Sequence, residues 1–418
     1  MLKFLSLRRR LLLGVLAGLG PGLIASNAGN DAGGIATYAS VGAQYGYSLL
    51  WVIVVLTFMM AMVQEMCARM GAATGDGLTD LIRAHLGIRW TLLVLIALVI
   101  ANSGTIISEF AGIAAAAELF GVPRYFVVPP AAVFVWYLVV RGSYPRVEKI
   151  FLAMTLVFFA YPISAYLAQP DWGQVARGLV VPTIEWNRNY LFVMVATIGT
   201  TITPYMQLYI QSSVAEKGVT MREYGPQRLD VYLGAIFSNA ISAFIIIATA
   251  AVLFGTGVAL ESAADAARAL EPLAGPYAKI LFAVGLIGAS LLAAAVLPLS
   301  TTYSVCEALG LEKGVDKTVR EAPVFFGLYT GLIVVGAIVA LIPGLPLIDL
   351  LLIVQVINGL LLPFVLISIL RLINRRTIMG SAVNGPVYNV VAWATTILIT
   401  GFALTMVGSQ VFGWVFGV

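Results

Sequence analysis

Long runs of apolar residues alternate along the chain with short polar segments. Most runs reach about 20 residues, the length that an α-helix needs to cross a bilayer, and most carry few or no charges. The pattern predicts an all-α integral membrane protein with eleven membrane-spanning helices, at residues 11–41, 45–72, 90–119, 124–141, 146–168, 190–215, 229–256, 277–307, 323–342, 346–371 and 385–409.

The composition agrees with this pattern and excludes several classes of protein. Of the 418 residues, 60% are apolar and 11% are charged, whereas soluble domains are about 45–50% apolar and about 25% charged. A soluble enzyme, a disordered tail and a nucleic-acid binder are excluded, and we expect no catalysis, no nucleic-acid partner and no cofactor. The two cysteines, Cys67 and Cys306, lie in apolar runs, which argues against a disulfide framework.

The basic residues predict how the chain is oriented. Of the 24 Lys and Arg residues, 19 fall in the N-terminal segment and in alternate loops that share one side of the bilayer. Because basic loops remain in the cytoplasm, the N-terminus is expected in the cytoplasm and the C-terminus outside. We therefore expect a multi-pass protein of the inner (plasma) membrane, in contact with the lipid bilayer.

Two of the predicted spans are interrupted. Residues 25–34 contain three glycines, two asparagines and one aspartate, and residues 199–204 contain three threonines and Pro204. These residues disfavour a helix. Non-helical backbone at membrane depth is tolerated where it lines a cavity or is buried in protein. The alternative for the first interruption is two ordinary elements joined by a surface loop.

The interruptions occupy matching places in two halves of the chain. The halves are residues 11–168, with the first five spans, and residues 190–371, with the next five, followed by an additional helix at 385–409. Because each half has an odd number of spans, the two halves have opposite topology. Paired interruptions of this kind indicate an inverted-repeat secondary transporter with its substrate site at the breaks.

Two acids are expected deep in the membrane, where ionisable residues are usually functional. Asp31 lies in the first interruption among carbonyl groups freed from helical bonding, which favours a cation as substrate. Neither interruption contains a methionine or a histidine, and oxygen donors suit hard cations such as Mg²⁺, Ca²⁺ and Mn²⁺. Glu109 either lines a path for cations or protons or is a structural acid. The only histidine, His85, lies in a loop.

Other polar residues in the spans have a structural and a functional interpretation. Gln355 and Asn358 share one helix face and either line the substrate site or join helices. Glu65 and Arg69 are spaced for an ion pair within one helix. Four further acids close to span ends are expected at the membrane interface: Glu118, Asp230, Glu307 and Asp349.

The first span carries a recognisable pattern. It comprises Gly20-Pro-Gly-Leu-Ile, Asp31, and Gly42-Ala-Gln-Tyr-Gly-Tyr-Ser-Leu-Leu-Trp51, and the likeness continues through Glu109 and Leu362-Pro-Phe364. In these residues the chain resembles the Nramp family of divalent-metal transporters over nearly its whole length. The resemblance implies a LeuT-like fold with helices 1 and 6 broken.

Several positions depart from the family pattern. Where the family has Asp-Pro-Gly-Asn, this chain reads Asp31-Ala-Gly-Gly34, so the asparagine ligand is missing. Thr203 replaces the family's methionine and Tyr205 its first histidine. Ile106 replaces an aspartate three residues before Glu109. The missing side chains are expected to enlarge the cavity.

These departures resemble the Nramp-related magnesium transporter branch. The resemblance implies a transporter of Mg²⁺, and also of Mn²⁺, that functions as a monomer with weak or no proton coupling. The metal is a substrate, bound partly hydrated. Alternatives are a proton-coupled Mn²⁺/Fe²⁺ transporter, a carrier of a small organic cation or metabolite, and a non-transporting sensor. The implied metal-site residues are Asp31, Ala28, Gly34, Thr200, Thr203 and Gln355, and Glu109, Asn30 and Tyr205 are assigned to an ion or proton path.

Overall fold

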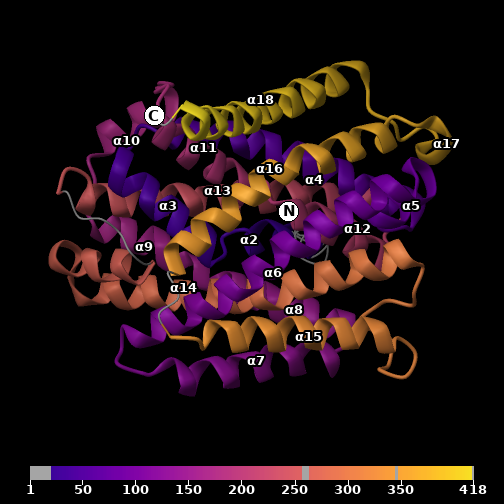
Figure 1. Ribbon diagram of the computed structural model, residues 1–418, viewed down its shortest axis with the longest axis horizontal. Coiled ribbons are helices and arrows are strands. Elements are labelled where there is room, and N and C mark those ends of the chain that lie inside the picture. Colours follow the sequence, from indigo (N-terminus) through magenta and orange to yellow (C-terminus); the bar gives the residue numbers. More distant parts are fainter. Residues whose placement is uncertain (1–19, 257–262, 344–346, 417–418) are drawn as a thin grey trace, which may run out of the picture.

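A computed structural model describes residues 20–256, 263–343 and 347–416, and within these ranges all regular structure is helical (Figure 1). Nine helical segments of the described chain are long and apolar enough to cross a membrane. They are α4 (Leu50–Thr74), α6 (Ile88–Glu118), α8–η1–α9 (Tyr144–Met154, Thr155–Phe159, Ala160–Leu167), α11–α12 (Arg188–Thr201, Pro204–Glu216), α13 (Tyr224–Leu253), α14 (Ala263–Leu309), α15 (Pro323–Ala340), α16 (Leu347–Ile373) and α18 (Pro386–Phe416).

The other two predicted spans are helical but shorter. The fourth span is α7 (Arg124–Val140), with 17 residues, and the first is α2 (Pro21–Ala28) followed by α3 (Ala32–Tyr45). The predicted beginning of the first span, residues 11–19, lies outside the described residues. Three short helices between spans were not predicted: α5 (Leu78–Leu86), α10 (Trp172–Val180) and α17 (Arg376–Met379). Helix α14 begins earlier than its predicted start at residue 277.

Both interruptions are narrower than the sequence indicated. The helices leave out only residues 29–31 in the first and residues 202–203 in the second. The expectation that residues 25–34 are non-helical throughout is wrong, because the side chain of Asp31 caps α3. Pro204 occupies the first turn of α12, where its missing N–H costs no hydrogen bond.

The broken helices occupy the centre of the helix bundle. Helix α3 packs against α13, α16, α11, α14 and α6, and α2 packs against α13 and α12. In Figure 1, α18 runs along one edge of the molecule and α7 and α15 along the opposite edge. The residues at the two breaks are consequently enclosed by protein, as non-helical backbone in a bilayer requires.

The carboxylate of Asp230, on α13, holds the N-terminal end of α2. It accepts hydrogen bonds from the backbone N–H groups of Gly20 at 3.0 Å, Gly22 at 2.7 Å and Leu23 at 3.2 Å. A β-carbon on Gly22 would lie 2.7 Å from the backbone of Val231, so glycine allows the two helices to approach this closely. An anion at a helix N-terminus also interacts favourably with the helix dipole.

The sequence did not predict that Asp230 and Glu307 are enclosed by protein. Both side chains are buried, and Glu307 accepts hydrogen bonds from α5 and α12. Proximity to a span end did not predict exposure because short helices and neighbouring spans cover these ends. Glu118 is partly exposed and pairs with Arg124, whereas the side chain of Asp349 lies outside the described residues.

Ion pairs between loops join loops that the distribution of Lys and Arg assigns to the same side of the bilayer. Lys217 forms an ion pair with Glu148 at 2.8 Å, and Lys313 pairs with Asp80. Each of these pairs joins two segments that the Lys and Arg pattern assigns to the same side of the bilayer. The relative sidedness of these loops therefore agrees with the folded structure.

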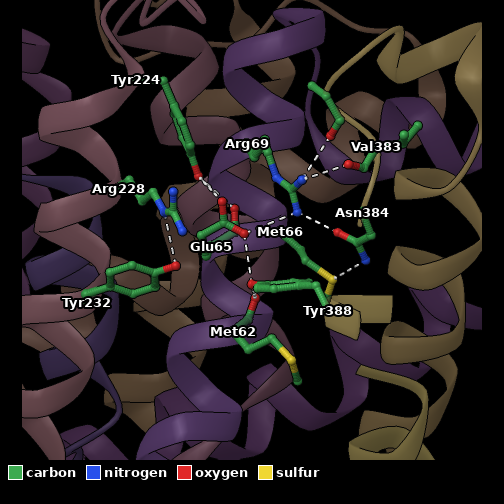
Figure 2. A network of polar contacts seen from close by, with 11 residues as sticks. Met62, Glu65, Met66, Arg69, Tyr224, Arg228, Tyr232, Val383, Asn384 and Tyr388 are labelled. Atoms are coloured by element: carbon green, nitrogen blue, oxygen red, sulfur yellow. Dashed lines mark hydrogen bonds and ion pairs between the residues drawn. The ribbon is translucent and has the colours of Figure 1, made fainter. Parts of the chain in front are cut away.

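A buried polar network attaches α18 to the rest of the bundle (Figure 2). The predicted ion pair between Arg69 and Glu65 is confirmed, with a distance of 3.2 Å. The hydroxyls of Tyr224 and Tyr388 donate to the same carboxylate at 3.0 and 2.9 Å, and Arg69 donates to Asn384. Figure 2 shows these side chains gathering around Glu65 and Arg69 from α4, α13, α18 and the segment that precedes α18.

Replacing Arg69 with methionine should destabilise the protein by about 3–5 kcal/mol, because it leaves a buried carboxylate without its cation. The double variant Arg69→Met/Glu65→Gln should recover part of this loss. Unfolding of the purified protein in detergent measures both effects. Arg124→Met is the control, since its partner Glu118 is partly exposed, and should cost less than about 1 kcal/mol. Equal losses for Arg69→Met and Arg124→Met would contradict this account.

Candidate functional site at the two helix breaks

Asp31 lies between α2 and α3, and its side chain is fully buried. One carboxylate oxygen, Oδ1, accepts the backbone N–H of Gly34 at 2.5 Å. The side-chain amide of Gln355, on α16, donates to Oδ1 at 3.2 Å and to Oδ2 at 3.4 Å. Asn358 in turn donates to the amide oxygen of Gln355 at 3.2 Å. Two amides of α16 thus support the carboxylate at the first break.

Three oxygen atoms converge beside the α-carbon of Gly34. A β-carbon at this position would lie 2.7 Å from the carbonyl oxygen of Gly29, 2.8 Å from Thr200 Oγ1 and 3.1 Å from Asp31 Oδ1. In the described part of the chain the buried Thr200 Oγ1 has no hydrogen-bond partner. Buried hydroxyls are normally paired, and a cation with oxygen ligands would provide Thr200 with a partner.

The two breaks are also bonded to each other. The hydroxyl of Tyr205, on α12, donates to the carbonyl oxygen of Ala28 at 2.7 Å. Thr203 donates to the carbonyl oxygen of Thr200 at 2.9 Å. These two hydroxyls pair carbonyl groups that the ends of α2 and α11 cannot pair within their own helices. Both carbonyl oxygens keep a second lone pair for a further contact.

Glu109 contacts the first break from α6. Its Oε2 accepts the backbone N–H of Ala32 at 3.0 Å, and its Oε1 accepts from Ser108 at 3.3 Å. The beginning of α3 therefore binds two carboxylates, those of Asp31 and Glu109. Helix dipoles make this end of a helix favourable for negative charge.

Asn30 lies apart from this group of residues. Its amide nitrogen donates to Ser238 and its amide oxygen accepts from Ser242, both on α13. The structure thus brings Asp31, Gly34, Thr200 and Gln355 together and places Ala28, Thr203 and Tyr205 at the same junction of helices. The contacts of Asn30 fix the break against α13.

The expected enlargement of the cavity is wrong for the conformation described. The space vacated by the missing side chain at position 34 is filled by oxygen atoms of Gly29 and Thr200, which lie too close to Gly34 for a side chain to fit. Asp31, Thr200 and Gln355 are all inaccessible to solvent. The backbone has closed around the position that lacks a side chain, so the site is occluded.

Sequence reasoning missed a sulfur atom next to the first break. The methyl group of Met206, on α12, lies against Gly29, and its sulfur is within 3.8 Å of the Gln64 amide nitrogen. The oxygen of that amide accepts from Ser26 at 2.7 Å. Gln64 was detectable as an amide inside an apolar run. Met206 follows the second interruption, and its proximity to the first break depends on the tertiary fold.

Comparisons with known proteins agree with this architecture. Residues 22–409 match the family described as natural resistance-associated macrophage protein-like, Nramp. The chain is 29% identical to the divalent metal cation transporter MntH of Deinococcus radiodurans over 406 residues, which cover 92% of this chain and 88% of that protein.

Solved structures show a similar fold. A manganese transporter of Eremococcus coleocola, in complex with an aromatic bis-isothiourea substituted compound, has a TM-score of 0.78 and 23% identity over 96% of this chain and 88% of that one. MhsT in complex with L-phenylalanine has a TM-score of 0.58 and 15% identity over 91% of this chain and 98% of that one. The predicted LeuT-like fold is confirmed, and the chain belongs to the Nramp family of membrane transporters.

Proposed function

We propose that this protein transports a divalent cation across the membrane through the site between the two helix breaks. The observation that supports this most directly is the convergence of the Asp31 carboxylate, the Gly29 carbonyl and the unpartnered Thr200 hydroxyl on one point. A carboxylate among neutral oxygen donors favours a hard cation. The curated relative from Deinococcus radiodurans is itself named a divalent metal cation transporter.

We further propose Mg²⁺ as the main substrate and Mn²⁺ as a second one. Support comes from the donor chemistry at the junction, where Thr203 occupies the position of the family's methionine and donates to Thr200. Because the described conformation is closed, this proposal rests on the ligand types and not on a wide cavity. Gln355, already bonded to Asp31, completes the set of oxygen-bearing side chains proposed to hold the ion or its water molecules.

The second candidate function is proton-coupled transport of Mn²⁺ or Fe²⁺. The solved Eremococcus coleocola relative is named a manganese transporter, and the sulfur of Met206 beside Gly29 offers a soft ligand close to the break. Thioether ligands favour transition metals over Mg²⁺. Uptake by vesicles containing the purified protein, measured for Mg²⁺, Mn²⁺, Ca²⁺ and an organic cation in competition, separates these candidates and the organic-cation carrier.

Several finer features belong to the same proposal. The protein lies in the plasma membrane with a cytoplasmic N-terminus and functions as a monomer. Residues 11–168 and 190–371 form the two inverted repeats, and residues 385–409 form the additional helix. Glu109, Asn30 and Tyr205 border the path of the ion. Uptake is driven by the membrane potential, worth about 4.6 kcal/mol for a divalent ion per 100 mV.

Replacing Asp31 with asparagine should abolish uptake of the divalent cation while leaving the fold intact. Asparagine remains a good N-cap for α3 but removes the negative charge that binds the ion. Since outer-shell changes at metal sites cost 10–100-fold, we expect a loss of more than about 100-fold. Asp171→Asn is the matched control, because Asp171 also caps a helix but lies on the surface. Near-normal uptake by a folded Asp31→Asn protein would refute the site.

Adding one methyl group at Gly34 should block the site. The β-carbon would collide with the Gly29 carbonyl and Thr200 Oγ1, and overpacking of this kind costs about 1–3 kcal/mol. Uptake by Gly34→Ala should fall at least roughly tenfold, measured at equal expression. Gly331→Ala on α15 is the control, since no atom lies within 4 Å of its added carbon. Equal uptake by both variants would show that the oxygen atoms at Gly34 do not bind the ion.

Ion uptake should occur without matching proton movement. The family has two acids on the helix that corresponds to α6. Here Ile106 replaces one of them, and the other, Glu109, accepts a hydrogen bond from the backbone of Ala32. Sealed vesicles loaded with a pH indicator should show membrane-potential-driven uptake without acidification, and Glu109→Gln should retain uptake. Acidification that scales with ion flux and disappears in Glu109→Gln would favour the proton-coupled candidate.

A further inference from the structure

A cavity of about 650 Å³ lies where the segment after α7 meets the segment before α15. Its wall includes Trp136 from the last turns of α7, Arg141 from the segment that follows α7, and residues 315–320 from the segment before α15. The basic-residue pattern places both segments on the same, cytoplasmic, side of the bilayer. The cavity therefore lies at the level of the lipid headgroups. Its residues are also far in the sequence from both helix breaks.

Hydrogen bonds hold the walls of this cavity in place. The indole nitrogen of Trp136 donates to Thr330 at 2.9 Å, which joins α7 to α15. Asp316 accepts the backbone N–H of Tyr144 at 2.7 Å and so fixes the loop against the first turn of α8. The cavity thus lies between the end of α7 and the loop before α15, and hydrogen bonds to α15 and α8 hold these two walls.

The charged groups around the cavity leave an excess of positive charge. Arg141 and Arg320 are exposed, and in the part of the chain described neither guanidinium has a hydrogen-bond or ion-pair partner. Lys317 pairs with the exposed Glu312 at 3.3 Å. Asp316 is the acid that lines the cavity, and it is bonded to backbone.

Two further acids near the cavity, Glu216 and Glu321, are also bonded to backbone, and Glu216 accepts the N–H of Val315 at 2.7 Å. Glu321 accepts the backbone N–H of Thr318 at 2.7 Å, and hydrogen bonds from Thr318 lower its pKa. The helix that follows, α15, begins with no side-chain cap, and an uncapped helix N-terminus adds further positive potential. Both arginines therefore remain available to an anion from outside the chain.

The helices on either side of the cavity, α7 and α15, carry exposed apolar side chains. Phe134 and Tyr137 of α7 are 48% and 62% exposed, and Val324 of α15 is 43% exposed. A ligand held in the cavity by its charge can therefore place hydrocarbon against these helices. A free anion would use the arginines without using this surface.

We propose that this cavity binds the headgroup of an anionic phospholipid of the cytoplasmic leaflet. The guanidinium groups of Arg141 and Arg320 hold the phosphate, for which arginine offers two parallel N–H donors. Lys317 adds charge, and the acyl chains lie along Phe134 and Tyr137. Basic pockets between helices at the cytoplasmic surface have the right chemistry for anionic headgroups. This site is independent of the ion proposed as substrate.

Native mass spectrometry of the purified protein with added phosphatidylglycerol or phosphatidylcholine tests this proposal. The wild type should bind phosphatidylglycerol in preference, and Arg141→Gln/Arg320→Gln should bind it roughly thirtyfold more weakly. Arg89→Gln/Arg376→Gln is the matched control, because it removes two exposed arginines from the same side of the protein but away from the cavity. The control should bind phosphatidylglycerol as the wild type does.

Three results would overturn the proposal. Unchanged phosphatidylglycerol binding by Arg141→Gln/Arg320→Gln would exclude the cavity, and equal loss in the control variant would show a nonspecific effect of surface charge. Displacement of the lipid by millimolar inorganic phosphate alone would show that the site binds a free anion. Melting temperatures in phosphatidylcholine should be the same for all variants, which confirms that a loss of binding does not reflect unfolding.

Discussion

Backbone polar groups cannot remain unpaired inside a bilayer, and the interruption between α2 and α3 satisfies this constraint with side chains from distant helices. Asp31 and Glu109 accept the N–H groups at the beginning of α3, and Tyr205 donates to the carbonyl group of Ala28. Because these partners are themselves acidic or hydroxyl-bearing, the groups that stabilise the break also create an electronegative point in the membrane. In the proposed function, stability and cation recognition therefore arise from the same contacts.

The same principle applies to the other end of α2. Asp230 on α13 pairs the N–H groups at its beginning, so both ends of this eight-residue helix are held by side chains of other helices. Asn30 adds a third attachment to α13. The position of α2 in the bundle therefore depends on a few hydrogen bonds to side chains outside it.

The sequence was sufficient for features that depend on local composition or short spacing. Apolar runs located the spans, and the spacing of four residues identified the ion pair between Glu65 and Arg69. The contact between Asp31 and Gln355 joins residues 324 positions apart, and no local pattern encodes it. The narrowness of the breaks depends on capping by Asp31, and the closed state of the site depends on how near α3 approaches α11 at Gly34. The resemblance to a known family predicted the fold. The hydropathy pattern alone located the spans but could not show how they pack together.

The central claim is that one cation binds between the breaks, with the carboxylate of Asp31 and the hydroxyl of Thr200 among its ligands. Crystals of the protein soaked in Mn²⁺ and measured at a wavelength where manganese scatters anomalously locate that ion directly. The account predicts one anomalous peak within ligand distance of Asp31 and Thr200, and no peak at this place in Asp31→Asn. A peak elsewhere in the protein, with none between the two breaks, would contradict it.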